Sequence, residues 1–195
     1  MTPLLTGVFA SQISGHLTPS FTLTGNYDAL STATVPSGGL SSVTFAGIPQ
    51  TGYSHLQLRI LARSNRSAVN IDYMELTFNS DTAANYSFHQ LFGDGSTVSV
   101  DTSAQNNIIV SRISTTSSGV SIFGGVIIDV LDYANTSKYK TTRSLGGVDL
   151  NGSGRIYLNS GNWRNTAAIT NINITPSSAN IFVEYSQIAL YGVKA

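Results

Sequence analysis

The chain contains no cysteine among its 195 residues, so neither disulfide bonds nor thiolate metal ligands are available to it. Charged residues are also scarce: they make up 10% of the sequence, whereas a typical soluble protein has about a quarter. Basic and acidic side chains balance, at ten each, and the basic ones are scattered. Because nucleic-acid binding needs concentrated positive charge, no nucleic-acid partner is expected.

Long hydrophobic runs are missing as well. No stretch approaches the roughly 18 consecutive apolar residues of a membrane-spanning helix, so no membrane insertion is expected. The first residues, MTPLLTGVFASQISGHL, are mildly apolar but carry no basic residue ahead of the apolar part, and we predict no secretory signal. Serine, threonine, asparagine and glycine replace the missing charges, a composition typical of extracellular and virion β-proteins.

The 3.6-residue period of an amphipathic helix is absent too. Apolar and polar side chains instead alternate in short runs, clearest over residues 53–63 and 73–78, and turn signals recur about every ten residues. The pattern predicts an all-β fold, namely an antiparallel, jelly-roll-like β-sandwich over residues 28–195. Residues 1–27 keep no period, and we expect an extended N-terminal arm there; a frayed terminus or a first edge strand is the alternative.

The stretch with the clearest organisation is residues 126–147, VIIDVLDYANTSKYKTTRSLGG. Its first part is an apolar, β-branched run, and residues 134–137 supply small polar side chains suited to a turn. Residues 138–145 then alternate basic and hydroxyl side chains. We expect a long antiparallel hairpin whose outgoing arm is apolar and whose return arm is solvated.

Residues with catalytic or metal-binding potential are few and scattered. A glycosidase needs two carboxyl groups flanking a cleft, but Asp129 and Asp132, three residues apart on a strand, face opposite sides. The histidines at 16, 55 and 89 show no zinc-ligand spacing, and the turn sequence DLNGS at 149–153 lacks the downstream acidic ligand of a calcium loop. No catalytic residue, metal or cofactor is predicted, and the chain is not expected to be an enzyme.

Aromatic side chains near turns give the one candidate ligand site. Trp163 and Arg164 follow a predicted Ser-Gly-Asn turn at 160–162, and Tyr157 lies six residues upstream. An exposed tryptophan with a nearby tyrosine could stack on a sugar ring, so Tyr157, Trp163 and Arg164 are the candidate glycan-binding residues. The alternative is that Trp163 packs at the end of the sandwich core.

Four segments carry a family resemblance: residues 41–64, 85–99, 127–147 and 185–194, with further similarity in the N-terminal LLTGVFASQISGHL. Together they resemble a group of small, largely uncharacterised proteins encoded by tailed bacteriophages, over most of the chain. The resemblance implies a structural or associated protein of the virion, from the tail and adsorption region. It implies no catalytic residues.

The functional expectation is therefore a virion component, made in the host cytoplasm, that forms part of a tail fibre or similar appendage and takes part in host attachment. We expect it to contact other virion proteins through its N-terminal arm and to form a homo-oligomer, with a trimer favoured because repeated weak sites gain avidity. One alternative is a capsid decoration protein bound over capsid joints. Another is a lectin-like module that binds host glycans through Trp163.

Overall fold

The computed structural model describes residues 25–177 and 179–194, and it confirms the predicted all-β class. Twelve strands and one short 3-10 helix make up the described part of the chain. They are β1 (Tyr27–Thr34), β2 (Val43–Ala46), β3 (His55–Ser64), β4 (Ile71–Phe78), β5 (Tyr86–Gly93), β6 (Val98–Gln105), β7 (Ile108–Thr115), η2 (Thr116–Ser118), β8 (Gly124–Leu131), β9 (Lys140–Asp149), β10 (Gly154–Trp163), β11 (Asn171–Pro176) and β12 (Gln187–Val193).

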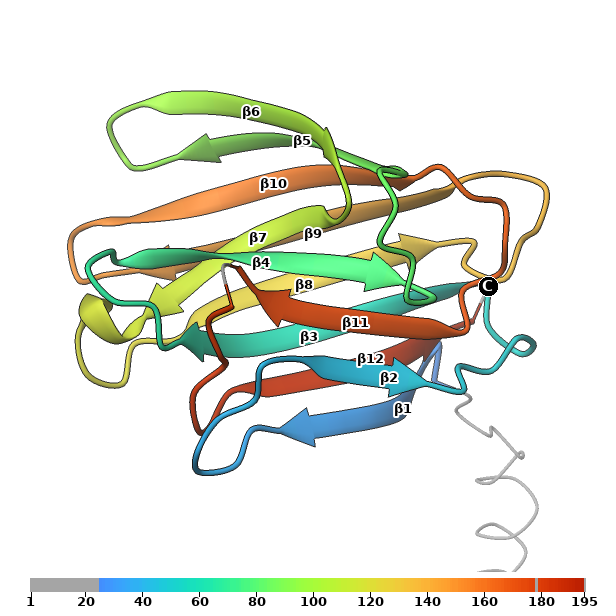
Figure 1. The fold of residues 1–195 in the computed structure, drawn as a ribbon, viewed down its shortest axis with the longest axis horizontal. Helices are drawn as coiled ribbons and strands as arrows, with labels where there is room; N and C mark the ends of the chain where they lie inside the picture. The colour runs from blue at the N-terminus through green and yellow to red at the C-terminus, as the bar shows by residue number, and fades with distance from the viewer. Residues whose placement is uncertain (1–24, 178, 195) are drawn as a thin grey trace, which may run out of the picture.

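The strands form two layers, which Figure 1 shows one over the other. The large sheet has the order β1-β12-β3-β8-β9-β10-β5-β6, and every pair in it is antiparallel. The small sheet, β2-β11-β4-β7, is antiparallel as well and lies over the large one, with β7 packed across β9 and β10. The end of β3 joins the layers through a short parallel pairing with β7. Within the described residues, one face of the large sheet is thus covered and the other is not.

The alternating sequence pattern explains the core between the sheets. In β3, Leu56, Leu58 and Ile60 are buried, which agrees with the alternation over residues 53–63, and in β4 Met74 and Phe78 are fully buried. Successive side chains of a strand point to opposite faces, so each alternating run supplies one apolar face to the interior.

One predicted break in the strands is wrong. Residues 160–162 were expected to turn, yet β10 continues without interruption to Trp163. At Gly161 a Cβ atom would lie 2.5 Å from Cγ2 of Ile108 in β7. Glycine is needed there because β7 crosses closely, and not because the chain turns.

The predicted central hairpin is present as β8 and β9, but its return arm is not solvated. Lys140, Thr142 and Ser144 of β9 point inward and are buried. Lys140 Nζ donates to backbone carbonyls, among them that of Thr166 at 3.0 Å, and burial lowers the pKa of this amine. Polar side chains therefore line part of the interior.

A bulge in β7 explains much of this buried polarity. The pairing of β4 with β7 shifts between Met74 and Glu75, which leaves Val110 of β7 out of register. The Val110 carbonyl accepts hydrogen bonds from across the layers, from Ser144 Oγ and from Asn159 Nδ2 at 2.7 Å. An unpaired buried carbonyl is costly, so these two side chains of the large sheet supply the partners that the ladder does not.

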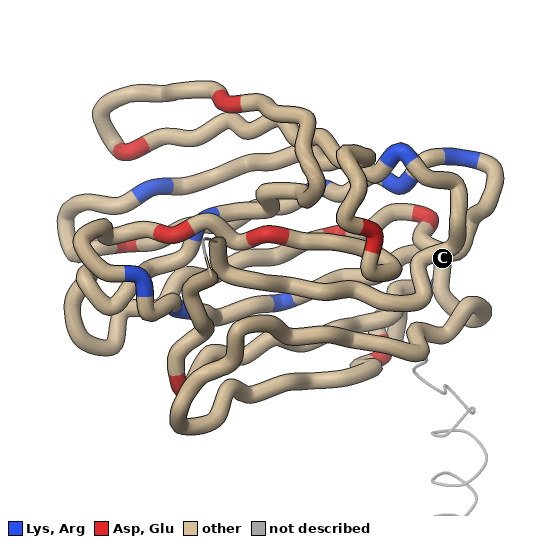
Figure 2. The backbone as a smooth tube through the Cα atoms, viewed as in Figure 1, with Lys and Arg blue, Asp and Glu red and all other residues tan. Residues whose placement is uncertain are grey.

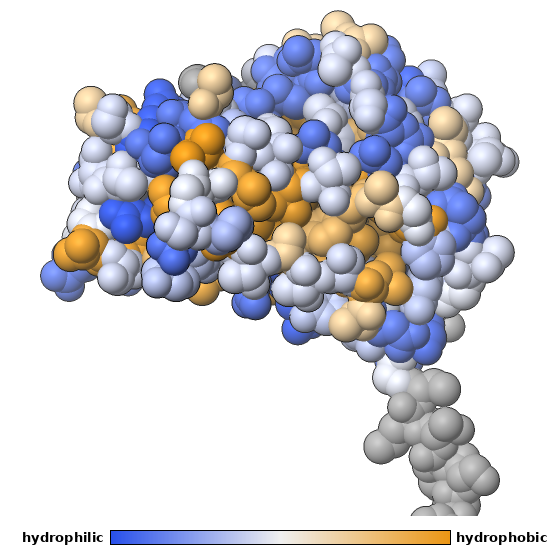
Figure 3. All heavy atoms as spheres, turned by 60° about the horizontal axis from the view of Figure 1, so that its bottom comes forward, coloured by the Kyte–Doolittle hydropathy of each residue, from blue (hydrophilic) through white to orange (hydrophobic). Residues whose placement is uncertain are grey.

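The edge of the molecule at β1 and β2 leaves the core only partly covered. Figure 3, which brings this edge forward, shows apolar atoms between hydrophilic margins. Leu30 and Ala33 of β1 pack against the core and are partly buried. Most of the predicted N-terminal arm, residues 1–24, lies outside the described residues; Tyr27, its last predicted residue, is the first residue of β1.

Charges are sparse over the described chain, and Figure 2 shows both signs distributed along it. No helix in the described ranges is long and apolar enough to cross a membrane.

Candidate functional site

The three predicted glycan-binding residues do not form an exposed site. Trp163 and Tyr157 are buried at 1% and 0% exposure, because both point inward from β10. The Trp163 ring lies 6.2 Å from that of Tyr86 and 5.5 Å from that of Phe78, measured between centroids. Neither ring face is free to stack on a sugar. This corrects the expectation of loop aromatics and agrees with the alternative that Trp163 packs in the core.

Hydrogen bonds hold this end of β10 in place. Trp163 Nε1 donates to Asp81 Oδ2 at 2.8 Å, and Asn85 Nδ2 donates to the same oxygen at 3.0 Å. The bonds from Asn85 and Trp163 lower the pKa of the Asp81 carboxyl. Arg164 is exposed, and its Nη2 donates to the Ala84 carbonyl at 2.6 Å. The residues around Trp163 thus fasten the loop before β5 to the end of β10.

Tyr157 belongs to a packed aromatic cluster between the layers. The Arg112 guanidinium lies 4.2 Å from the ring centroid of Tyr73 and 5.5 Å from those of Phe92 and Tyr157. Burial raises the pKa of the Tyr157 hydroxyl. Cation–π contacts of this kind stabilise the packing of β7 against β5 and β10.

The acidic residues and histidines weighed for catalysis form no common cluster in the described part of the chain. Asp129 Oδ2 lies 3.0 Å from Arg143 Nη2 on the outer face of the large sheet, whereas Asp132 follows β8, forms an ion pair with Lys138 and donates its backbone N–H to His55 Nδ1 at 2.9 Å. His89 lies in β5, and the histidine at position 16 is outside the described ranges. Within those ranges, no group of three metal-ligating side chains could hold an ion.

The turn at 149–153 is a tight turn, as favoured from the sequence. The Leu150 amide donates to the Ser153 carbonyl at 2.8 Å. Asp149 Oδ1 accepts from the Asn151 amide at 2.8 Å, so this carboxylate is engaged by the turn itself.

The feature that stands out is the uncovered outer face of the large sheet. The register places five aliphatic side chains directly opposite one another across neighbouring strands, from β8 to β6. We call this row the ridge: Ile127, Leu145, Leu158, Leu91 and Val100. These side chains are between 45% and 79% exposed. A contiguous apolar row of this kind is unusual on the surface of a soluble monomer.

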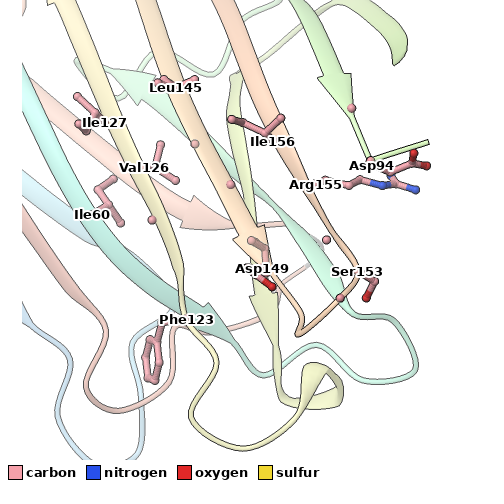
Figure 4. Close-up of a pocket in the computed structure, with 18 of the residues that line it drawn as sticks. Ile60, Asp94, Phe123, Val126, Ile127, Leu145, Asp149, Ser153, Arg155 and Ile156 are labelled. Carbon is pink, nitrogen blue, oxygen red and sulfur yellow. The ribbon is translucent and has the colours of Figure 1, made fainter. Parts of the chain in front are cut away.

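A second row lies two residues further along each strand and is rich in glycine. We call it the glycine row: Leu61, Gly125, Gly147, Ile156, Gly93 and Val98. Beside the ridge the surface sinks into an open depression of about 970 Å³. Figure 4 shows Ile127, Leu145 and Ile156 on three adjacent strands around it, with Asp149 toward the turn. The outer face therefore has a raised apolar row next to a low one.

The same face becomes polar beyond the ridge. A third row holds Gln57, Asp129, Arg143, Ser160 and His89. Its charges are paired with each other, since Asp129 accepts from Gln57 Nε2 at 2.9 Å and from Arg143. The apolar part of the face is thus bordered by a neutral polar strip, the usual arrangement of a protein interaction surface.

Comparison with protein-family models, with curated proteins and with solved structures found no significant match to the chain.

The sequence reading did not identify the outer face, although a signal was present. Val126, Ile127 and Ile128 are consecutive and apolar, so one of them must point away from the core. Leu145 and Leu158 continue that outward row on the next two strands. Only the pairing register shows that these residues lie side by side, because they are distant in sequence.

Proposed function

We propose that this chain is a structural component of a tailed bacteriophage virion and that it forms part of the tail and adsorption apparatus. The observation that carries the proposal is the apolar outer face of the large sheet, about half exposed on the ridge, in a chain with only 10% charged residues. Contiguous apolar surface of this size is suited to being covered by protein. The resemblance to proteins encoded by tailed bacteriophages is the reason for proposing a phage virion as the assembly in which this surface is covered.

The buried aromatic side chains bear on the lectin-like alternative. Since Trp163 and Tyr157 point into the core, a glycan-binding role for this pair receives no support from their positions. The proposal therefore assigns to the domain an assembly role, with the partners being other virion proteins and further copies of the chain.

The test is to locate the chain on purified particles from its source. Antibodies raised against the recombinant protein should label the tail or its fibres in electron micrographs, and mass spectrometry should find the chain in gradient-purified particles at many copies. Label over the capsid lattice would assign the chain to head decoration instead. Absence of the chain from purified particles would overturn the proposal.

A further inference from the structure

We propose that the outer face of the large sheet is where two copies of this chain pair, about a two-fold axis that runs across the strands between the ridge and the glycine row. The inference deepens the proposed function and rests on it, because it names the partner that covers the apolar face. It also differs from the trimer expected from the sequence.

The two rows are self-complementary on β8, β9 and β5, where a ridge residue meets a glycine; on β10 and β6 aliphatic side chains meet each other, Leu158 with Ile156 and Val100 with Val98. A rotation by 180° about such an axis stacks each strand on the same strand of the second copy, running in the opposite direction. The ridge of one copy then lies over the glycine row of the other. Ile127 of one copy then lies over Gly125 of the other, and Leu145 lies over Gly147, and the same contacts form reciprocally. An isologous interface requires this match of a surface with itself.

Nothing among the described residues of one chain explains the glycine at position 125. A Cβ atom built there would meet no atom within 4 Å, and the residue lies inside a strand without a positive φ angle. Glycine in a strand interior lowers stability, and it commonly marks a place where another backbone or a ligand approaches closely. The close approach of a second copy gives this glycine a role.

The size of the face meets the need of a stable dimer. Strands β3, β8, β9, β10, β5 and β6 each contain 8 or 10 residues. Because the axis lies near the glycine-row end of the strands, the two copies overlap over about six residues of each strand. With strands about 4.8 Å apart and a rise of about 3.3 Å per residue, this overlap covers on the order of 600 Å² in projection, which is the low end of a standard interface at about 600 Å² from each partner.

The charges on the face allow it to meet itself. Arg59 and Arg143 are balanced by Asp129 and Asp149, and the closest pair, Arg143 with Asp129, is already an ion pair at 3.0 Å. A face with a net charge of one sign would repel its own copy. This one is neutral, and the ridge and the glycine row carry no charged side chain.

The pairing is tested by measuring the molecular mass of the species that the purified full-length chain forms in solution. Sedimentation equilibrium over a wide concentration range should show a dimer, at twice the 20.6 kDa of the chain. Leu145→Lys places an ammonium group in the dry contact, and it should weaken dimerisation about 100-fold or more. Gly125→Val places a side chain in the glycine row and should weaken dimerisation as well, although the position of a new Cβ atom contacts no described atom of the same chain.

Val120→Lys is the matched control, because Val120 is 89% exposed in the turn before β8 and lies outside both rows. This variant should dimerise like the wild type, and all variants should retain the wild-type far-ultraviolet spectrum. A wild-type chain that is monomeric at every concentration, a trimer, or a dimer unaffected by Leu145→Lys and Gly125→Val would each overturn the pairing. A monomer that is nevertheless found on the tail would overturn the pairing and leave the proposed function intact.

Discussion

The inner and the outer face of the large sheet both carry glycines and aliphatic side chains, but their surroundings differ. On the inner face, a Cβ at Gly161 would clash with Ile108, and one at Gly124 would lie 3.0 Å from the Ile113 Cα, both in β7. On the outer face, a Cβ at Gly125 would meet nothing within 4 Å. The inner glycines are explained by the strand that covers them.

This difference separates two kinds of constraint. The inner face shows what a covered face of this sheet requires: small residues where another strand crosses, and buried polar side chains such as Asn159, which donates to the Val110 carbonyl. The outer face has apolar rows and glycines that the described residues do not cover. A Cβ at Gly147 would lie 3.1 Å from the Arg155 carbonyl oxygen, but no described residue explains Gly125, and this glycine points to a second molecule.

The largest contrast is expected between two adjacent isoleucines of β8. Ile128 points inward and is fully buried, whereas Ile127 points outward and is 45% exposed. Ile128→Ala should lower the free energy of unfolding by about 2–5 kcal/mol through lost burial and a residual cavity. Ile127→Ala should cost less than about 1 kcal/mol, since half of its surface is already in water. Urea unfolding followed by the fluorescence of Trp163, at a concentration where the chain is monomeric, measures both. Equal losses would show that the two faces are covered alike in the monomer.

A second contrast compares glycines. Gly161→Ala forces the new methyl group against Ile108, and overpacking of this kind costs about 1–3 kcal/mol. Gly125→Ala meets no atom and restricts the unfolded chain, so it should leave stability unchanged or raise it by up to about 1 kcal/mol. Thermal unfolding of the two variants under identical conditions gives the comparison. If Gly125→Ala is the more damaging change, the outer face is already covered within one chain.

A third contrast concerns the polar side chains of β10. Asn159 is 3% exposed, donates to the bulged Val110 carbonyl and accepts from Gln90 Nε2 at 2.6 Å. Asn159→Ala should therefore cost about 1–3 kcal/mol, because buried groups lose their partners. Its neighbour Ser160 is exposed on the outer face, and Ser160→Ala should change stability by less than about 0.5 kcal/mol. Urea unfolding of both variants measures these costs, and a small effect of Asn159→Ala would mean that water replaces its hydrogen bonds.

The sequence was sufficient for the fold class and for most inward faces, because period-2 alternation is a direct consequence of strand geometry. It placed Leu56, Leu58 and Ile60 correctly on the buried side of β3. It did not show which strands are neighbours, and so it could not assemble Leu145 and Leu158 into one surface.

The turn predicted before Trp163 was wrong for a related reason. The triplet at 160–162 contains glycine between serine and asparagine, which is a turn signal by composition. The glycine instead accommodates β7, a contact between residues more than 50 positions apart that no local pattern records. The buried hydroxyl of Ser144 in β9 escaped prediction similarly, since the bulge that needs it lies in another strand.

The smallest effect is expected from acid, at the inner-face end of β10. Hydrogen bonds from Asn85, Trp163 and the Ala83 amide hold the pKa of the Asp81 carboxyl below its ordinary value of 3.8. Because the folded-state pKa is the lower one, the unfolded chain binds this proton more readily. The stabilisation is therefore complete above pH 3.8 and is lost as pH falls through the folded-state pKa.

Asp81→Asn retains an oxygen that can accept from Trp163 Nε1 but removes the titrating group. Its free energy of unfolding, measured by urea titration at a series of acidic pH values, should fall less steeply below pH 3.8 than that of the wild type. Trp163→Phe removes one of the hydrogen bonds and leaves that of Asn85, so it should reduce the acid dependence without abolishing it. Identical slopes in the wild type and in Asp81→Asn would mean that Asp81 is not bonded to the end of β10 in solution, and Trp163 would then be held by the rings of Phe78 and Tyr86 alone.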